Sequence, residues 1–181
     1  FKMPAEIAAS DHHAAKAVTI DYPLNAQARF SQNLLEQGSH PTSEKLLSVV
    51  RPASSHVAEA FAISEGDNVI HLRTLRRVNG VALCLIDHYF TDLQLWPVLQ
   101  TFTHGSLHDL LRDRLDIELT RVRTKISARR AQAKESNILG IPNMAPLLCV
   151  RTLNHRQGEQ SATEYSVSLT RADMIEFTME H

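Results

Sequence analysis

The feature that most restricts the fold of this chain is the dipeptide Asn79-Gly80, which lies between two apolar-rich runs in the segment Val69–Phe90. Asn-Gly is a preferred pair for a two-residue type I′ turn, because both central residues of that turn adopt positive φ. Apolar-rich runs on either side of such a pair are typical of a β-hairpin. The sequence therefore predicts two antiparallel strands joined at Asn79-Gly80.

The turn also predicts which side chains share a face of the hairpin, because side chains alternate along a strand. With a two-residue loop, Val78 pairs with Val81 and Arg76 pairs with Leu83. The more apolar face, which we expect to point at the core, then carries Leu72, Thr74, Arg76, Val78, Val81, Leu83, Leu85, Asp87 and Tyr89. The opposite face carries His71, Arg73, Leu75, Arg77, Ala82, Cys84, Ile86, His88 and Phe90, and we interpret its charges as solvated.

The predicted core face contains a cation, Arg76, and burying an unpaired charge costs several kcal/mol or more. Three interpretations remain open for this side chain. Arg76 forms a structural pair with an aspartate, extends to solvent from the edge of the sheet, or binds an anionic ligand in a cavity.

The rest of the chain alternates short helical and extended patterns. Helices are predicted at Asn25–Gln37, Ser54–Phe61, Asp92–Thr101, Ser106–Leu115 and Gln132–Leu139. Further strands are predicted at Glu44–Val50, Ile117–Ala128, Leu147–His155, Ser161–Thr170 and Met174–Met179, with an extended stretch at Ala17–Asp21. Strands joined mostly as hairpins, with short helices between them, predict an α+β fold built on a mainly antiparallel, six-stranded sheet.

The segment Ser161–Thr170 has a polar face made by Glu164, Ser166, Ser168 and Thr170. The simpler interpretation is an outer face in contact with solvent. The alternative is a hydrogen-bonding pocket wall, in which a carboxylate and hydroxyl groups suit an amine or a sugar hydroxyl.

Basic residues at Arg121, Arg123, Lys125 and Arg129 are predicted to share one face of the strand Ile117–Ala128. No aromatic residues alternate with them, so a solvated sheet face is favoured over a nucleic-acid surface. His104 and His108 have i, i+4 spacing but no acidic or cysteine partner nearby, so no metal site is expected. No motif indicates a catalytic nucleophile.

Composition limits the function further. A chain of 181 residues with a net charge of −1 fits one domain that does not itself attract nucleic acid. No apolar run approaches the ~20 residues needed to span a bilayer. The two cysteines, Cys84 and Cys149, are interpreted as reduced thiols inside strands, which suggests a cytoplasmic protein.

Between Gln27 and Phe177, several short motifs follow one another in a defined order. They are Ala28-Arg29-Phe30, with Leu34 to Gly38 closing the helix; Leu72–Leu75-Arg76–Asn79-Gly80, leading into Asp87-His88-Tyr89-Phe90; Gly105-Ser106-Leu107-His108; Ala133-Lys134-Glu135–Ile138-Leu139-Gly140-Ile141-Pro142; and Glu164-Tyr165-Ser166, leading to Arg171-Ala172-Asp173. In this order they resemble the effector-binding (UTRA) domain of the GntR superfamily, HutC subfamily, and within it the repressors of phosphonate-utilisation operons.

The resemblance implies a chorismate-lyase-like fold with a ligand cavity. Carried over position by position, it implies that the ligand-binding residues are Arg29, Thr74, Arg76, Ser106, His108, Glu164 and Ser166. Thr74, Ile86 and Thr170 stand where an arginine, an acidic residue and an aromatic are usual in the family. The phosphate-binding side therefore looks retained and the sugar side altered, so a small phosphonate, alkyl or aminoalkyl, is a plausible ligand.

The resemblance also implies how the domain is used. We expect residues 1–23 to be a linker or tail that follows a winged helix-turn-helix domain outside this sequence, which begins at Phe1, and residues 24–181 to be the effector-binding domain. The expected partners are a small anionic effector bearing a phosphonate or phosphate, operator DNA through the preceding domain only, and a second copy of the chain. No cofactor, metal or membrane is expected. The alternative function is a chorismate-lyase-like enzyme acting on a small anionic substrate.

Overall fold

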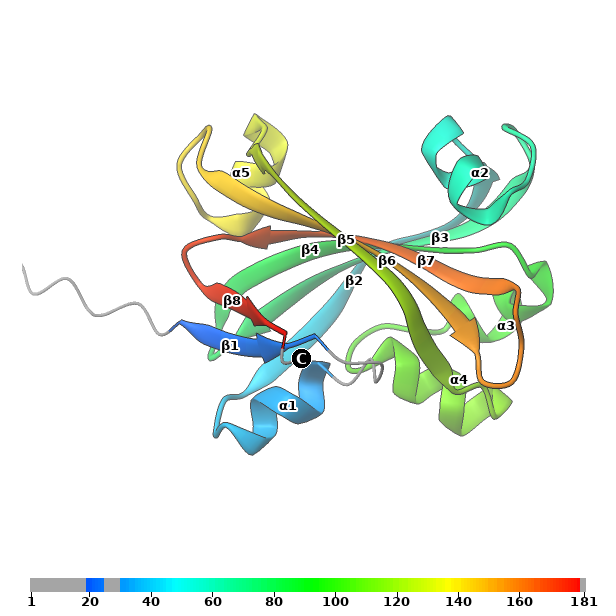
Figure 1. The fold of residues 1–181 in the computed structure, drawn as a ribbon, viewed down its shortest axis with the longest axis horizontal. Helices are drawn as coiled ribbons and strands as arrows, with labels where there is room; N and C mark the ends of the chain where they lie inside the picture. Colours follow the sequence, from blue (N-terminus) through cyan, green and yellow to red (C-terminus); the bar gives the residue numbers. More distant parts are fainter. Residues whose placement is uncertain (1–18, 25–29, 180–181) are drawn as a thin grey trace, which may run out of the picture.

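The computed structural model of the chain describes residues 19–24 and 30–179 (Figure 1). Its helices are α1 (Phe30–Glu36), α2 (Ser55–Phe61), the 3₁₀ helix η1 (Leu93–Leu95), α3 (Trp96–Leu99), α4 (Leu107–Leu115) and α5 (Ala133–Leu139). Its strands are β1 (Ile20–Pro23), β2 (Pro41–Pro52), β3 (Asn68–Val78), β4 (Val81–Phe90), β5 (Leu119–Arg130), β6 (Pro146–Arg156), β7 (Ala162–Arg171) and β8 (Ile175–Thr178). Most predicted segments coincide with these elements, but the predicted helix Asp92–Thr101 is divided into η1 and α3.

The predicted hairpin is confirmed. β3 and β4 are joined by Asn79 and Gly80, whose φ angles are +50° and +80°, and Val78 pairs with Val81. Positive φ at both positions is what a type I′ turn requires, and it explains why this dipeptide occurs here.

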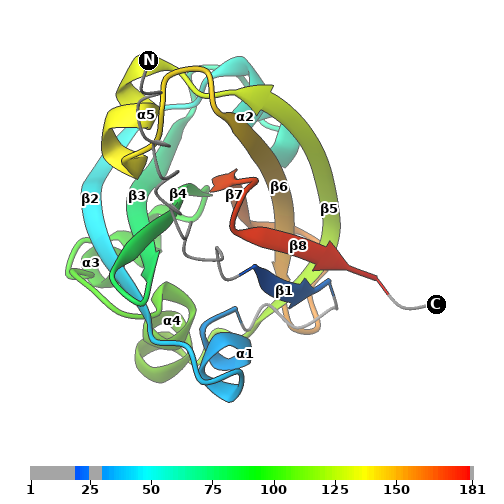
Figure 2. The ribbon, with the colours of Figure 1, turned by 90° about the vertical axis from the view of Figure 1, so that its left-hand side faces the viewer.

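Six strands form the main sheet, in the order β2-β3-β4-β7-β6-β5. Every neighbouring pair is antiparallel, so the predicted α+β fold with a mainly antiparallel six-stranded sheet is confirmed. The two remaining strands, β1 and β8, form a separate parallel pair. Figure 2 shows this β1–β8 pair lying across the hollow side of the strongly twisted main sheet.

The main sheet has helices on both faces. In Figure 1, α2 and α5 lie above it, while α1, α3, α4 and the β1–β8 pair lie below. On the lower face, Ile70, Leu72 and Phe90 of the hairpin pack with Leu99 and Leu111 of the helices. On the upper face, one apolar cluster contains Leu75, Leu85, Leu139 and Leu147, and a second packs α2 against the sheet. An apolar core on each face thus packs the main sheet against its helices.

A β-bulge between Arg76 and Arg77 corrects the predicted face assignment. Beyond the bulge Arg76 pairs with Cys84, not with Leu83, and Arg73 pairs with Asp87. One extra residue in one strand exchanges the faces of all side chains that follow. The lower face therefore carries Thr74 and Arg76 with Cys84, Ile86 and His88, whereas Asp87 points to the upper face. The prediction that Arg76 and Asp87 share a face was wrong.

Candidate functional site

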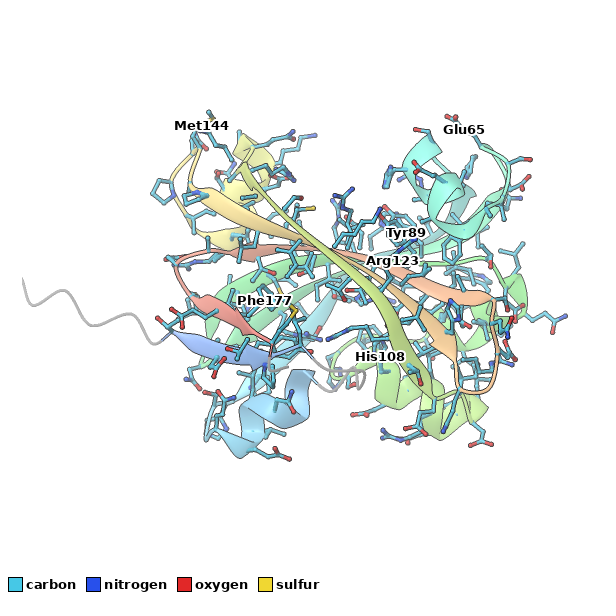
Figure 3. All side chains as sticks on the ribbon, viewed as in Figure 1. Glu65, Tyr89, His108, Arg123, Met144 and Phe177 are labelled. Carbon is cyan, nitrogen blue, oxygen red and sulfur yellow. The ribbon has the colours of Figure 1, made fainter. Side chains whose placement is uncertain are left out.

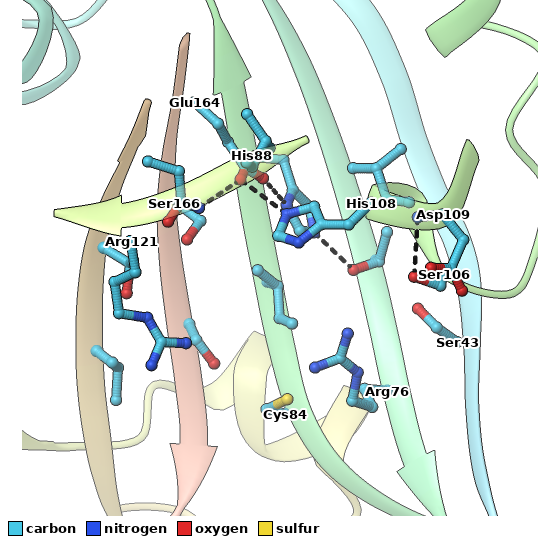
Figure 4. A pocket seen from close by; sticks show the side chains of 18 of the residues that line it. Ser43, Arg76, Cys84, His88, Ser106, His108, Asp109, Arg121, Glu164 and Ser166 are labelled. Atoms are coloured by element: carbon cyan, nitrogen blue, oxygen red, sulfur yellow. Dashed lines mark hydrogen bonds and ion pairs between the residues drawn. The ribbon is translucent and has the colours of Figure 1, made fainter. Parts of the chain in front are cut away.

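A cavity of about 630 Å³ lies between the lower face of the main sheet, the start of α4 and the β1–β8 pair (Figure 4). Side chains from β3, β4, β5, β6 and β7 form its walls, and the β1–β8 pair contributes Tyr22, Ile175 and Phe177. A cavity of this size falls within the range of small-molecule sites, which are concave and carry few polar groups among apolar ones. The site is therefore built on the inner face of the sheet, where Arg76 of β3 lies opposite Cys84 of β4.

The cavity brings together all the predicted binding residues that the structure describes: Thr74, Arg76, Ser106, His108, Glu164 and Ser166. The remaining predicted residue, Arg29, lies outside the described residues. These side chains come from three elements far apart in the sequence, namely β3, α4 with its N-cap, and β7. Their convergence is a property of the fold, and their role as ligand contacts stays a prediction.

Glu164 is the centre of a hydrogen-bonded network in the cavity wall. Its side chain has no exposed surface. His88 Nδ1 donates to Oε1 over 2.7 Å, and His108 Nε2 donates to Oε2 over 2.8 Å. Asn154 Nδ2 donates to the same Oε2 over 2.7 Å, and His88 Nε2 hydrogen-bonds the Thr74 hydroxyl at 3.2 Å. Figure 4 shows His108 standing between this network and the open part of the cavity.

These donors determine the charge of Glu164. Burial alone would raise its pKa, but the charge and hydrogen bond of His108, with the hydrogen bond from His88, hold that pKa well below its ordinary value. The carboxylate is thus ionised and already accepts three N–H bonds from the protein. The group that this network presents to the cavity is His108, whose side chain is 28% exposed.

The polar face of β7 points into the cavity, so the interpretation of an outer face in contact with solvent was wrong. Glu164, Ser166, Ser168 and Thr170 all line the cavity. Ser166 lies across from His88 on β4 and Thr152 on β6. A wet cavity wall has the same alternation of polar and apolar residues as a solvent-exposed strand, and this is why periodicity alone did not separate the two.

Sequence reasoning missed Arg121, which also lines the cavity. A bulge between Arg121 and Arg123 shifts the register of β5 against β6, so that Arg121 pairs with Asn154 on the inner side. The prediction that Arg121 shares a face with Arg123, Lys125 and Arg129 was therefore wrong. Its Nη2 donates to the Tyr22 hydroxyl over 3.0 Å, and its guanidinium lies 5.7 Å from the centroid of that ring.

The N-terminus of α4 opens into the cavity. Ser106 caps the helix, and its hydroxyl oxygen accepts from the Asp109 amide over 3.1 Å. Capping satisfies one of the amides that a helix leaves without an intrahelical partner at this end. The partial positive charge of the helix end adds to that of Arg76, because helix N-termini favour anions.

The upper face of the sheet carries a different polar cluster, centred on Asp87. Arg73 donates to both carboxylate oxygens, over 2.7 and 2.8 Å, and His71 Nε2 donates over 2.6 Å. Tyr89 stacks on His71 with ring centroids 4.6 Å apart. Figure 3 shows Tyr89 and Arg123 on the side of α2 and α5, and His108 and Phe177 on the cavity side. The structural Arg–Asp pair of this hairpin therefore involves Arg73 rather than Arg76.

Two further features bear on the class of site. Among residues 19–24 and 30–179, no three His, Cys, Asp or Glu side chains are grouped so as to hold a metal ion. Over the same residues, no helix combines the length and apolar character needed to cross a membrane.

His104 hydrogen-bonds Thr103, while His108 belongs to the Glu164 network. Cys84 is buried and Cys149 half-buried, and both are free thiols.

The cavity under a twisted antiparallel sheet defines a small-molecule-binding domain with a chorismate-lyase-like fold. Residues 36–176 match the UTRA domain, and the chain belongs to this family of effector-binding domains. The chain is 80% identical over 161 residues to a probable transcriptional regulator of Escherichia coli K12, PhnF, covering 89% of this chain and 67% of that protein.

Solved structures agree with this assignment. The crystal structure of a PhnF C-terminal domain has 78% identity and a TM-score of 0.74, covering 87% of this chain and 99% of that one. The effector domain of PhnF from Mycobacterium smegmatis shares the fold at 23% identity, with a TM-score of 0.78 over 90% of this chain and 99% of that one.

The chain spans about two thirds of the length of the curated relatives it matches. These relatives are named as transcriptional regulators. They confirm the expectation of a regulatory domain of the GntR type and give no support to the alternative of a chorismate-lyase-like enzyme.

Proposed function

We propose that this domain binds a small anionic effector, a phosphonate or a phosphate ester, and thereby modulates operator binding by a winged helix-turn-helix domain that precedes it. The observation that carries the proposal is Arg76, a half-buried cation on the inner face of β3 that lines a cavity of about 630 Å³. A guanidinium group pairs with phosphoryl oxygens in a fork geometry, with charge-assisted hydrogen bonds.

The neighbours of Arg76 support an anion at this place. Ser106 opens α4, whose N-terminal amides and dipole favour negative charge, and Ser43 lies beside it on the cavity wall. Thr74 is on the same face of β3 and adds a hydroxyl. A phosphoryl group offers three acceptor oxygens to these donors. The site therefore has the composition of a phosphate or phosphonate pocket.

Glu164 supports the pocket indirectly. Its carboxylate accepts from His88, His108 and Asn154, so it orients the two imidazoles and holds a proton on His88 Nδ1 and on His108 Nε2. His108 is then the side chain of this network that reaches a ligand. We assign Glu164 a positioning role, in place of the direct ligand contact that the family resemblance implies.

Regulation follows from differential binding. An effector can change operator affinity only by binding more tightly to one of two conformations of the complete regulator, and the coupling acts equally in both directions. Tyr22 of β1 lines the cavity, so a ligand there would contact the strand that is nearest to a preceding domain. Dimerisation on a two-fold operator and a cytoplasmic location are parts of the same proposal.

The test is isothermal titration calorimetry of the 181-residue chain with methylphosphonate and with small phosphate esters. We expect binding by the unmodified chain and a loss of at least about ten-fold in affinity in Arg76→Ala, since a charge-assisted hydrogen bond contributes about 1.5–3 kcal/mol. Arg77→Ala is the matched control. Arg77 is the next residue along β3, forms an exposed pair with Glu44, and is outside the cavity.

Thermal unfolding gives a second, independent measurement. A ligand present at 100 times its dissociation constant stabilises the folded state by about 2.7 kcal/mol. Absence of both heat and stabilisation for every phosphonate and phosphate ester would overturn the proposal. Equal affinity of Arg76→Ala and the unmodified chain would show that the anion binds elsewhere.

A further inference from the structure

A second pocket, of about 390 Å³, lies on the upper face of the main sheet, between α2 and α5 (Figure 1). We call it the upper pocket. His56 of α2 and Glu135 of α5 contribute to its walls, and its other lining residues belong to strands β3 to β7. The main sheet separates it from the cavity to which the proposed function assigns the effector, so the upper pocket has no part in that function.

The carboxylates that line the upper pocket, Asp87 and Glu135, are each bonded to an arginine. Asp87 accepts two hydrogen bonds from Arg73, and Glu135 accepts two from Arg129, over 2.6 and 2.7 Å. Each carboxylate accepts a further short hydrogen bond, from an imidazole and from a backbone amide respectively. Their negative charges are thus already paired, and neither balances a third cation of the pocket.

That third cation is Arg151 of β6, which lies directly across from Lys125 of β5. Both residues are exposed, and within the described part of the chain neither side chain forms a hydrogen bond or an ion pair. Directly opposed residues of an antiparallel pair have Cβ atoms about 5 Å apart, and like charges in these positions repel each other. An anion held between the two side chains would relieve this repulsion.

The next cross-strand pair on the same face supplies a neutral donor beside the two cations. Ser127 of β5 lies opposite Cys149 of β6, two residues along from Lys125 and Arg151, which is ~7 Å of strand. Ser127 and Cys149 both line the upper pocket. The four residues therefore form a compact group, in which one small anion can contact the guanidinium, the ammonium and the hydroxyl together.

We propose that Arg151, Lys125 and Ser127 form a second anion-binding site, which takes a small tetrahedral oxyanion such as a phosphate or sulfate group. Arg151 offers a guanidinium fork, Lys125 a point charge and Ser127 a hydroxyl, and a tetrahedral oxyanion has enough oxygens to accept from all three. The site is open to solvent, so its affinity falls as ionic strength rises. It goes beyond the proposed function and does not depend on it.

Cys149 serves as a local reporter for this site. The experiment compares its alkylation rate with iodoacetate, which is anionic, and with iodoacetamide, which is neutral, by peptide mass spectrometry. Both reagents attack through the thiolate, so the ratio of the two rates does not depend on the ionised fraction of the thiol. At low ionic strength we expect this ratio to exceed that of N-acetylcysteinamide by about three-fold or more, because two nearby positive charges attract the anionic reagent.

Variants assign the effect to the site. Arg151→Ala should lower the ratio by about two-fold or more, whereas Arg151→Lys, which keeps the charge, should retain most of it. Arg130→Ala is the matched control: Arg130 is an exposed arginine at the end of β5, next to Arg129 and on the opposite face, so the chain loses the same charge. Cys84 is 2% exposed and should stay unmodified in every variant, which verifies that each one is folded.

Sulfate is the probe for the ligand. It should slow the reaction of Cys149 with iodoacetate in a saturating way, beyond the effect of sodium chloride at the same ionic strength, and Arg151→Ala should abolish this protection. Acetate at the same ionic strength should protect less, because a carboxylate has only two oxygens. Protection by acetate that equals or exceeds that by sulfate would overturn the preference for a tetrahedral group.

Calorimetry with sulfate decides the question if Cys149 reacts too slowly to follow. It uses Arg76→Ala, in which the cavity is expected to bind anions weakly, and the double variant Arg76→Ala with Arg151→Ala. Heat of binding that requires Arg151 supports the site, and its absence overturns it.

Other outcomes also count against the inference. Sulfate that acts no differently from chloride would mean that Arg151 and Lys125 are solvated charges only. Protection of Cys149 by polyglutamate where sulfate gives none would assign the upper pocket to an acidic peptide instead. The phosphonate titrations of the proposed function concern the other face of the sheet, so either proposal can fail while the other stands.

Discussion

The two faces of the main sheet each bury a carboxylate beside histidine, and they use it differently. On the upper face Asp87 is paired with Arg73 and His71, which makes a closed ion pair. On the cavity face Glu164 is held by two imidazoles and an amide, and the arginines Arg76 and Arg121 line the cavity beside this network. The arrangement of partners, more than the presence of a buried charge, distinguishes a structural pair from a binding site.

The largest effect is expected from breaking the upper cluster. Asp87→Asn removes the charge that Arg73 and His71 share and leaves both donors incompletely paired. Loss of one partner of a fully buried ion pair lowers the free energy of unfolding by about 3 kcal/mol or more. We expect a somewhat smaller loss for Asp87→Asn, because the Arg73 side chain is 38% exposed. Urea unfolding measures this change. Calorimetry should find phosphonate affinity within about two-fold of the unmodified chain, and a large loss of affinity would contradict the division between the faces.

The β3–β4 hairpin shows how much of the difference between the two faces could be predicted from the sequence. Asn79-Gly80 predicted the turn, the strands and the Val78–Val81 pairing, because positive φ at two successive positions has a strong residue preference. The resemblance to the family brought Thr74, Ser106 and Glu164 to one predicted site without any knowledge of the fold.

The bulges at Arg76 and Arg121 were not predictable from local pattern. Neither contains a glycine or another residue with a marked conformational preference, and each depends on how a strand meets its neighbour. One bulge moved Asp87 to the upper face and the other moved Arg121 into the cavity. Errors of one residue in register therefore account for the wrong face assignments on both strands.

Acidification provides the next largest expected effect. Burial raises the pKa of Asp87, but the hydrogen bonds from His71 and Arg73 outweigh it and lower that pKa to about 2 from 3.8. A depressed pKa in the folded state contributes stability that is complete above the unfolded value and is lost as the pH falls through the folded value. The shift corresponds to about 2 kcal/mol, lost between about pH 4 and pH 2.

The variant Asp87→Asn serves as the reference for this titration, since it lacks the ionisable group and retains Glu164. Urea unfolding of both chains at several pH values from 5 to 2 should show their stability difference shrinking by about 2 kcal/mol. A stability difference between the two chains that stays constant over this pH range would mean that Asp87 is not the titrating group. The contrast between the Asp87 and Glu164 clusters would then have no electrostatic support.

The smallest effect tests whether Glu164 acts through His108. Glu164→Gln keeps the shape and one acceptor oxygen but removes the charge, so His88 and His108 lose part of their orientation. We expect methylphosphonate affinity to fall by about ten-fold, the equivalent of one weakened charge-assisted hydrogen bond. A direct contact to an ammonium group would instead weaken 2-aminoethylphosphonate alone. Glu135→Gln, which alters the Arg129 pair on the upper face, is the matched control and should leave both ligands unaffected.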